Sequence, residues 1–249
     1  MEFCDLTNRR LIRLQPNNNR ENFFLKRGDY INDSIGTYLK VWDGDIVSSI
    51  SRFIKPDSNV IDIGANIGPW SLQLSKLISG KVYAFEPQPD VFNQLCANLW
   101  INQALNVIPF RRALFNQRCE KDFMVPELKN LGGSGLSSNI LNDRIKLFNL
   151  DSNNTYKVIT KTLDSYNFDN ISFIKIDVEG SEKEVLQGAI NTIQKYRPVI
   201  VFECWIESTF QVYKKDLLEY MLSLDYNIYD IVAQSWGNYL AIPKEYTTV

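Results

Sequence analysis

Histidine is absent from the 249 residues of this chain. Histidine is the side chain that most often exchanges protons near neutral pH, and it is a frequent metal ligand. Its absence excludes histidine-based catalysis and histidine metal sites. Any proton transfer must instead use a carboxylate, lysine, tyrosine, cysteine, water or a metal ion.

Cysteine is scarce and scattered. The four cysteines carry the numbers 4, 96, 119 and 204, and no two of them form a C-x-x-C pair. This spacing argues against a zinc site and against a disulfide framework, and it fits a reducing compartment. The N-terminus also lacks a basic stretch followed by an apolar run, which a secretory signal would need. We therefore expect a cytoplasmic protein.

Long apolar runs and an excess of one charge are also missing. No run of about eighteen apolar residues occurs, so we expect no transmembrane helix. The formal net charge is -2, so no overall field favours nucleic acid. We expect a small-molecule partner, no nucleic acid and no membrane span. The sequence leaves open whether the chain forms a homo-oligomer.

Short apolar runs alternate with helical patterns along most of the chain. Strands are predicted at 59–63, 81–85, 107–110, 171–176 and 199–203, and helices at 43–53, 68–79, 90–102, 181–195 and 214–224. Strand–helix alternation with apolar strands is typical of an α/β fold, in which helices cover both faces of a parallel sheet. Residues 1 to about 40 are polar, and we expect them to be irregular, with a loop at Asn17 to Asn19.

The end of the chain and one internal segment depart from this alternation. Two strand patterns, 226–232 and 239–242, are joined by a connection too short for a parallel crossover, so they are expected to form an antiparallel hairpin. Residues 116–162 read as an insertion in which 123–125 and 157–159 could pair as strands. Within it, Gly132 to Gly135 is either a lid over a site or an ordinary flexible loop. We expect one domain over 55–249, with 1–54 as its N-terminal extension and helix.

The strongest local motif is Val60 to Gly68, in which an apolar strand runs into a glycine-containing turn followed by a helix. Glycine allows a tight turn and the close approach of a ligand to the backbone, and ligands of open α/β sheets bind beyond the carboxyl ends of the strands. Asp62 near this end could attract a positively charged amine or sulfonium. The alternative is a turn that merely connects strand and helix.

Glu86 ends the next strand, 22 positions after Gly64. An acid about 20 residues past the glycines commonly binds the two ribose hydroxyls of a nucleotide. A nicotinamide dinucleotide usually requires G-x-G-x-x-G, whose second glycine lets the pyrophosphate approach. Here Asn66 stands at that position, between Gly64 and Gly68. The pattern therefore favours S-adenosylmethionine, which has no phosphate.

Lys175, Asp177, Glu179 and Glu203 form the second group of candidate residues. Lys175 lies in a strand expected to be buried, where an unpaired ammonium is costly, and Asp177 shares its side of the strand. If 171–176 and 199–203 are neighbouring strands, Asp177, Glu179 and Glu203 converge. Such a cluster could supply a general base, orient a hydroxyl or hold a divalent cation. A structural Lys–Asp pair and ordinary strand-end acids are the alternatives. We predict no metal ligands.

Seven segments together resemble the FkbM family of methyltransferases. They read VIDIGANIG (60–68), AFEP (84–87), NLWIN (98–102), TLD (162–164), IKIDVEG (174–180), EVLQG (184–188) and VFE (201–203). The resemblance spans roughly residues 55 to 205. It implies the class I methyltransferase fold, a Rossmann-like, mostly parallel seven-stranded sheet that ends in an antiparallel hairpin.

The resemblance also implies a function and roles for the motif residues. Members of the family are O-methyltransferases that act on hydroxyl groups of sugars, glycans and related metabolites. Contacts with S-adenosylmethionine are implied for Asp62, Gly64, Asn66, Gly68 and Glu86. The same resemblance makes Lys175, Asp177 and Glu179 active-site candidates.

We therefore predict an S-adenosylmethionine-dependent O-methyltransferase whose acceptor is a sugar, either nucleotide-linked or part of a glycan. Asp177 or Glu203 is the expected base, and Lys175 adjusts its protonation. Two alternatives stay open at this point: a module that binds S-adenosylmethionine without catalysis, and a nicotinamide-dependent oxidoreductase.

Overall fold

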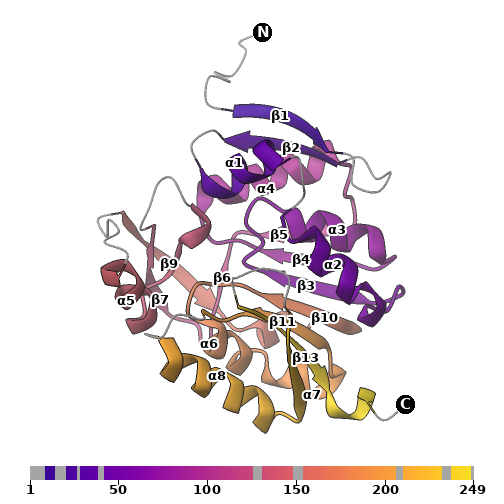
Figure 1. The fold of residues 1–249 in the computed structure, drawn as a ribbon, viewed down its shortest axis with the longest axis vertical. Helices are drawn as coiled ribbons and strands as arrows, with labels where there is room; N and C mark the ends of the chain where they lie inside the picture. Colours follow the sequence, from indigo (N-terminus) through magenta and orange to yellow (C-terminus); the bar gives the residue numbers. More distant parts are fainter. Residues whose placement is uncertain are drawn as a thin grey trace.

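The computed structural model describes residues 9–14, 21–26, 29–38, 42–125, 131–147, 154–205, 210–231 and 237–247. Its centre is a seven-stranded sheet (Figure 1). In spatial order the strands are β12 (Tyr226–Asp230), β13 (Asn238–Pro243), β11 (Val199–Glu203), β10 (Ile171–Ile176), β3 (Asn59–Ile63), β4 (Val82–Phe85) and β5 (Val107–Phe110). Within this described sheet β13 runs antiparallel to both neighbours, and the other pairings are parallel. The predicted sheet and its terminal hairpin are confirmed.

Helices cover both faces of the sheet. One layer contains α2 (Gly44–Ile50), α3 (Pro69–Leu77) and α4 (Pro89–Ile101), and the other contains α6 (Glu182–Gln187), α7 (Ile190–Tyr196) and α8 (Gln211–Ser223). Successive strand residues point to opposite faces. In β3, Val60 accordingly packs in the first core cluster and Ile61 in the second. This is why the central strands read as continuous apolar runs.

One predicted helix is in fact two. The helix expected at 181–195 breaks between α6 and α7, around Gly188, where an added Cβ would lie 2.1 Å from the backbone oxygen of Phe115. The carboxylate of Asp164 then caps the start of α7 by accepting hydrogen bonds from the backbone N–H groups of Asn191 and Thr192, both at 2.9 Å. A capped second helix is favoured over a continuous one because Asp164 satisfies donors that a helix start leaves free.

The prediction of an irregular N-terminal region was wrong. The segment forms β1 (Arg9–Leu14), β2 (Glu21–Lys26) and α1 (Tyr30–Tyr38), and β1 pairs antiparallel with β2. The side chains of Asn98 and Asn102 on α4 accept hydrogen bonds from Phe24 N and Asn22 N, at 2.6 and 2.8 Å. These partners are more than seventy residues away, so local sequence gives no sign of them. The loop expected at 17–19 lies outside the described residues.

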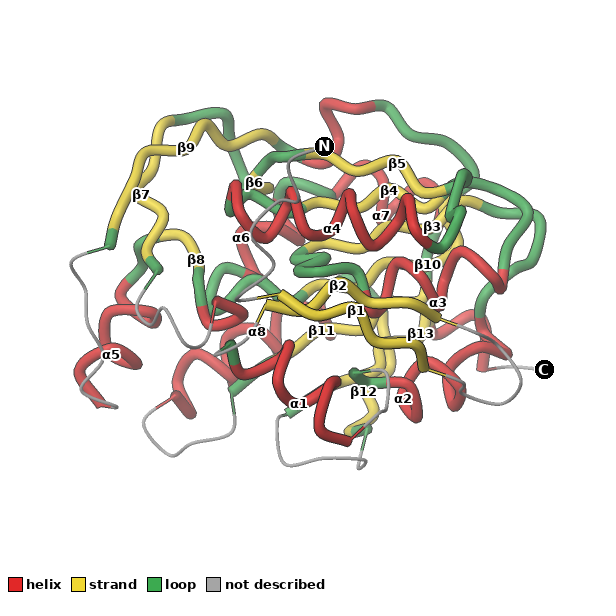
Figure 2. Tube along the Cα trace, turned by 90° about the horizontal axis from the view of Figure 1, so that it is seen from above, coloured by secondary structure: helices red, strands yellow, loops and turns green. Residues whose placement is uncertain are grey.

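The insertion forms a small sheet beside the main one (Figure 2). The insertion contributes β7 (Glu120–Met124), β8 (Gly135–Leu136), α5 (Asn139–Leu147) and β9 (Thr155–Lys161), and β6 (Ala113–Leu114), just before it, pairs with β9. Strands β7 and β9 pair antiparallel, with Phe123 opposite Tyr156, so the predicted pairing within the insertion is confirmed. Short 3-10 turns complete the described elements at Ser51–Phe53, Leu131–Gly133, Leu163–Tyr166 and Lys244–Thr247.

A buried polar network joins the N-terminal segment to the glycine-rich turn of the insertion. Asp29 Oδ1 accepts a hydrogen bond from Leu131 N at 2.8 Å, and Asp29 Oδ2 accepts one from Asn32 N at 3.2 Å. Asn32 Oδ1 in turn accepts from Lys26 N at 2.8 Å. Buried polar groups need hydrogen-bond partners, so this network holds the N-terminal segment against the turn at residues 131–133.

No helix in the described parts of the chain is both long enough and apolar enough to cross a membrane.

The turn after β3 depends on Gly64 and Gly68, which both have positive φ, +78° and +97°. A Cβ on Gly64 would lie 1.7 Å from the backbone oxygen of Asp177, whereas a Cβ on Gly68 would lie 2.8 Å from the flexible end of Leu95. Gly64 is thus the position where the ends of β3 and β10 come into contact.

We predict that Gly64→Ala destabilises the protein by more than about 2 kcal/mol, because rigid backbone must move in addition to the backbone strain. Gly68→Ala is the matched control, since it carries the same positive-φ strain without the backbone collision. Urea unfolding of both variants measures the difference. Equal losses would show that the contact between Gly64 and Asp177 is not limiting.

Candidate active site

A cavity opens at the carboxyl ends of β3, β4, β10 and β11, where α/β sheets usually bind ligands. Its walls come from the strand-end loops, the N-terminal segment and the insertion. The acidic residues that line it are Asp43, Glu86, Asp177, Glu179 and Glu203, and the basic ones are Arg112, Arg144 and Lys175. The glycine-rich residues 132–135 also line it.

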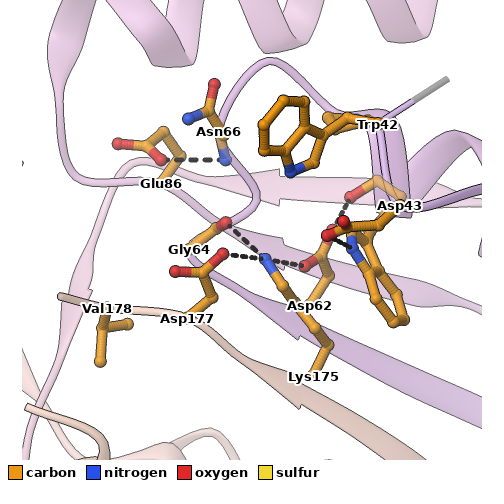
Figure 3. A network of polar contacts seen from close by, with 12 residues as sticks. Trp42, Asp43, Asp62, Gly64, Asn66, Glu86, Lys175, Asp177 and Val178 are labelled. Atoms are coloured by element: carbon orange, nitrogen blue, oxygen red, sulfur yellow. Dashed lines mark hydrogen bonds and ion pairs between the residues drawn. The ribbon is translucent and has the colours of Figure 1, made fainter. Parts of the chain in front are cut away.

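Lys175 is the centre of the polar network below this cavity (Figure 3). Its ammonium donates to the backbone oxygen of Gly64 at 3.1 Å and pairs with Asp177 Oδ2 at 3.1 Å and with Asp62 Oδ1 at 3.8 Å. Burial alone would lower the pKa of Lys175, but Asp177 and Asp62 raise it above its ordinary value. Lys175 therefore stays charged at neutral pH, and the pairing expected from the sequence is present.

Asp62 lies beneath the cavity and does not line it. The residue is fully buried, and its Oδ2 accepts a hydrogen bond from the Ser71 hydroxyl at 2.6 Å. Burial raises the pKa of Asp62, and Lys175 opposes this. The structure thus shows Asp62 beside Lys175, and the attraction of an amine that the motif suggested stays a prediction. Gly68 is likewise outside the cavity lining and shapes the turn.

Glu86 is held at the end of β4 by two backbone donors. Its Oε2 accepts from Asn66 N at 3.0 Å and its Oε1 accepts from Gln88 N at 2.8 Å. Burial raises the pKa of Glu86 to about 7, although both hydrogen bonds lower it. The carboxylate lines the cavity together with Gly64 and Asn66. Each oxygen keeps a lone pair that could accept a further hydrogen bond.

Asp177, Glu179 and Glu203 come together as the sequence suggested for neighbouring strands. Each offers a carboxylate oxygen, and these oxygens lie within 4.8 Å of one another. Hard divalent cations prefer oxygen ligands, so among the described residues these three could hold such an ion. Glu179 adopts a left-handed φ of 59°, which is uncommon for a residue with a side chain.

The three carboxyl groups differ in protonation. Burial raises the pKa of Glu203 well above its ordinary value, and Asp177 raises it further. Burial also raises the pKa of Glu179, to about 8, against the effect of Arg144. Burial acts on Asp177 in the same direction, but Lys175 and a hydrogen bond from Glu203 outweigh it and lower its pKa. At neutral pH Asp177 is therefore the ionised member of the cluster, and the protonated Glu203 donates a hydrogen bond to it.

Sequence reasoning missed several residues of this cavity. Arg144 on α5 pairs with Glu179 Oε2 at 2.5 Å and lies over the Trp205 ring, with 4.7 Å between the guanidinium carbon and the ring centroid. Asp43 was seen only as the start of a helix. Neither residue belongs to a local motif, and only the folding of the insertion and the N-terminal segment brings them here.

The strand order, with its single reversed strand next to the edge, and the cavity at the strand ends define a class I methyltransferase fold. The methyltransferase FkbM domain matches residues 62–228, and the chain belongs to this family. Membership implies S-adenosylmethionine as the methyl donor, and it argues against the nicotinamide alternative.

Three relatives illustrate the family. The hexuronic acid methyltransferase AglP of Haloferax volcanii is 28% identical over 159 residues, which cover 63% of this chain and 60% of the relative. Methyltransferase sdnD of Sordaria araneosa is 26% identical over 189 residues, covering 64% of this chain and 71% of the relative. The crystal structure of methyltransferase FkbM from Methylobacillus flagellatus superposes with a TM-score of 0.53 at 22% identity, over 76% of this chain and 44% of that protein. The match thus spans less than two thirds of the first and third relatives.

The residues present fit S-adenosylmethionine. The donor bears two ribose hydroxyls, a positive sulfonium and an ammonium, and acidic side chains that could accept hydrogen bonds from the hydroxyls or pair with the cations line the cavity. Two backbone donors fix the carboxylate of Glu86, which could accept hydrogen bonds from the ribose hydroxyls. The backbone of Gly64 to Asn66 forms the adjoining wall.

We predict that Glu86 makes stability depend on pH. Its folded pKa of about 7 exceeds the ordinary 4.5, so the folded state holds the proton longer than the unfolded state. Stability therefore falls as pH rises between these values and stays reduced above them. Glu86→Gln cannot ionise. Its unfolding free energy, relative to the unaltered protein, should rise by about 1–3 kcal/mol from pH 4 to pH 8.

Urea unfolding at several pH values measures this difference. Glu219→Gln, at an exposed position on α8, serves as the control and should show a constant offset. A constant offset for Glu86→Gln as well would contradict the raised pKa.

Proposed function

We propose that this chain is an S-adenosylmethionine-dependent O-methyltransferase that acts on a hydroxyl group of a sugar. The observation that carries the proposal is that two groups of residues, one suited to the methyl donor and one suited to a proton, line the same cavity. Glu86 and the turn at Gly64 to Asn66 form the donor half, and the carboxyl cluster of Asp177, Glu179 and Glu203 forms the half that handles a proton.

The donor half binds by hydrogen bonds and charge. Glu86 accepts hydrogen bonds from the ribose hydroxyls, and the backbone of Gly64 and Asn66 contacts the rest of the donor. S-adenosylmethionine supplies a methyl group on a positively charged sulfur, which becomes a neutral thioether when the methyl–sulfur bond breaks. Much of the chain's work is then to position the acceptor oxygen and to exclude water.

The carboxyl cluster removes the hydroxyl proton. Asp177 is the ionised member, and 31% of its side chain is exposed, against 11% for Glu179. As the new carbon–oxygen bond forms, the proton of the acceptor hydroxyl passes to Asp177. Lys175 keeps this carboxylate charged, and Glu203 shares its proton with it. Because such pairs titrate together, the resulting pH dependence belongs to Asp177 and Glu203 jointly.

The choice of a sugar rests on family likeness. The Haloferax relative carries the name hexuronic acid methyltransferase, and Arg112, whose guanidinium group could pair with a carboxylate, lines the cavity. A nucleotide-linked or glycan-bound sugar offers the hydroxyl that the cluster would deprotonate. We propose no metal requirement.

Incubation with S-adenosylmethionine and a panel of uronic acids, neutral sugars and sugar nucleotides tests this function. The expected result is formation of S-adenosylhomocysteine together with a sugar product heavier by one methylene. Donor binding with no turnover on any acceptor would favour the non-catalytic module. Binding of NAD in place of S-adenosylmethionine would contradict the proposal altogether.

We predict that Asp177→Asn lowers kcat by about a hundred- to ten-thousandfold, the usual contribution of a general base. Affinity for the donor should change little, because the amide keeps the size of the side chain. Asp57→Asn, at an exposed position remote from the cavity lining, is the control. Near-normal turnover by Asp177→Asn would remove Asp177 from this role and leave Glu203 as the candidate.

A further inference from the structure

Part of the cavity wall comes from outside residues 62–228, the segment that matches the family. Among these residues, Trp42 and Asp43 lie between α1 and α2. Figure 3 shows both side chains at the edge of the Lys175 network. No motif in the chain assigns them a role.

Asp43 is held in a defined position. Its Oδ2 accepts a hydrogen bond from Trp70 Nε1 at 3.0 Å, and its backbone has a φ of 56°. Aspartate tolerates this left-handed conformation better than most residues. This hydrogen bond engages Oδ2, and the Asp43 side chain belongs to a residue that lines the cavity.

The surroundings make this carboxylate a suitable partner for a cation. Burial raises the pKa of Asp43, while the hydrogen bond from Trp70 and the charge of Lys175 lower it. Lys175 is already bound by Asp177 and Asp62. The indole of Trp42, in edge contact with Tyr30 at 6.0 Å between ring centroids, walls this end of the cavity. A charge pair that aromatic rings shield from water is stronger than an exposed one.

We infer that Asp43 binds the ammonium group of the methionine part of S-adenosylmethionine, an inference that rests on the proposed function. The motif carboxylate Asp62 is less well placed, because it is fully buried, is absent from the cavity lining and lies beside Ser71 and Lys175. Asp43 lines the cavity next to this network, whereas Asp177, which also lines it, is paired with Lys175 at 3.1 Å.

The ammonium is a better partner than the sulfonium on energetic grounds. The sulfonium loses its charge during transfer, so a carboxylate paired with it would stabilise the reactant more than the transition state and slow the reaction. The ammonium keeps its charge throughout. A pair with it strengthens binding of donor and transition state equally, which affects KM and leaves kcat unchanged.

Calorimetry with three ligands tests the inference. S-adenosylmethionine has both cations, S-adenosylhomocysteine has the ammonium alone, and methylthioadenosine has neither. Asp43→Asn should weaken binding of the first two by roughly ten- to hundredfold and leave the third unchanged. The amide oxygen can still accept from Trp70, so the fold is retained. Asp45→Asn, an exposed neighbour on α2, is the control and should bind all three normally.

Each other result has a distinct meaning. Loss for S-adenosylmethionine alone would place Asp43 at the sulfonium and overturn the inference, as would equal loss for all three ligands or no loss. Failure of the unaltered protein to bind any of the three would instead overturn the proposed donor. With an active acceptor, Asp43→Asn should raise KM for the donor at an unchanged kcat, and a fall in kcat alone would contradict a role in ammonium binding.

Discussion

The site depends on one buried ammonium, that of Lys175. It bridges the two strands at the centre of the sheet, because it arises from β10 and binds the backbone oxygen of Gly64 and the carboxylate of Asp62 at the end of β3. Removing one partner of such a buried group typically costs several kcal/mol, since the others remain charged and unpaired. The same ammonium keeps Asp177 ionised. Lys175 thus both joins the ends of β3 and β10 and keeps Asp177 ionised.

Acidic side chains lie on two sides of Lys175. Asp62 is fully buried and pairs with Lys175 inside the protein, whereas Asp43, Glu86 and Asp177 line the cavity. A cationic ligand would relieve the repulsion among the carboxylates that line the cavity, and each would then ionise more readily. Burial is the main cause of the raised pKa values of Glu86 and Glu179, about 7 and about 8, and the charge of Asp177 raises both further.

The features that could be predicted from the sequence are those that depend on residues close together in the chain. Apolar runs predict the strands of the sheet, and the short connection before residue 239 predicts the terminal hairpin, because each depends on neighbouring residues. The strand β2 and the break before α7 could not be predicted in this way. The side chains of Asn98 and Asn102 accept hydrogen bonds from β2, and that of Asp164 accepts one at the start of α7. In each case the two partners lie far apart in the sequence. The convergence of Asp177 and Glu203 could be predicted, because β10 and β11 were expected to be neighbours. The contact of Arg144 with Glu179 could not, because it depends on how the insertion folds.

Asp62 shows why a motif is an incomplete guide to a contact. Its place at the end of β3 is what the pattern predicts, yet the side-chain alternation of a strand decides whether that carboxylate faces the ligand or the interior. Ser71 on α3 and Lys175 on β10 draw it inward. Asp43, supplied by the segment before α2, lines the cavity and is held in place by Trp70 of α3, the helix that also contributes Ser71.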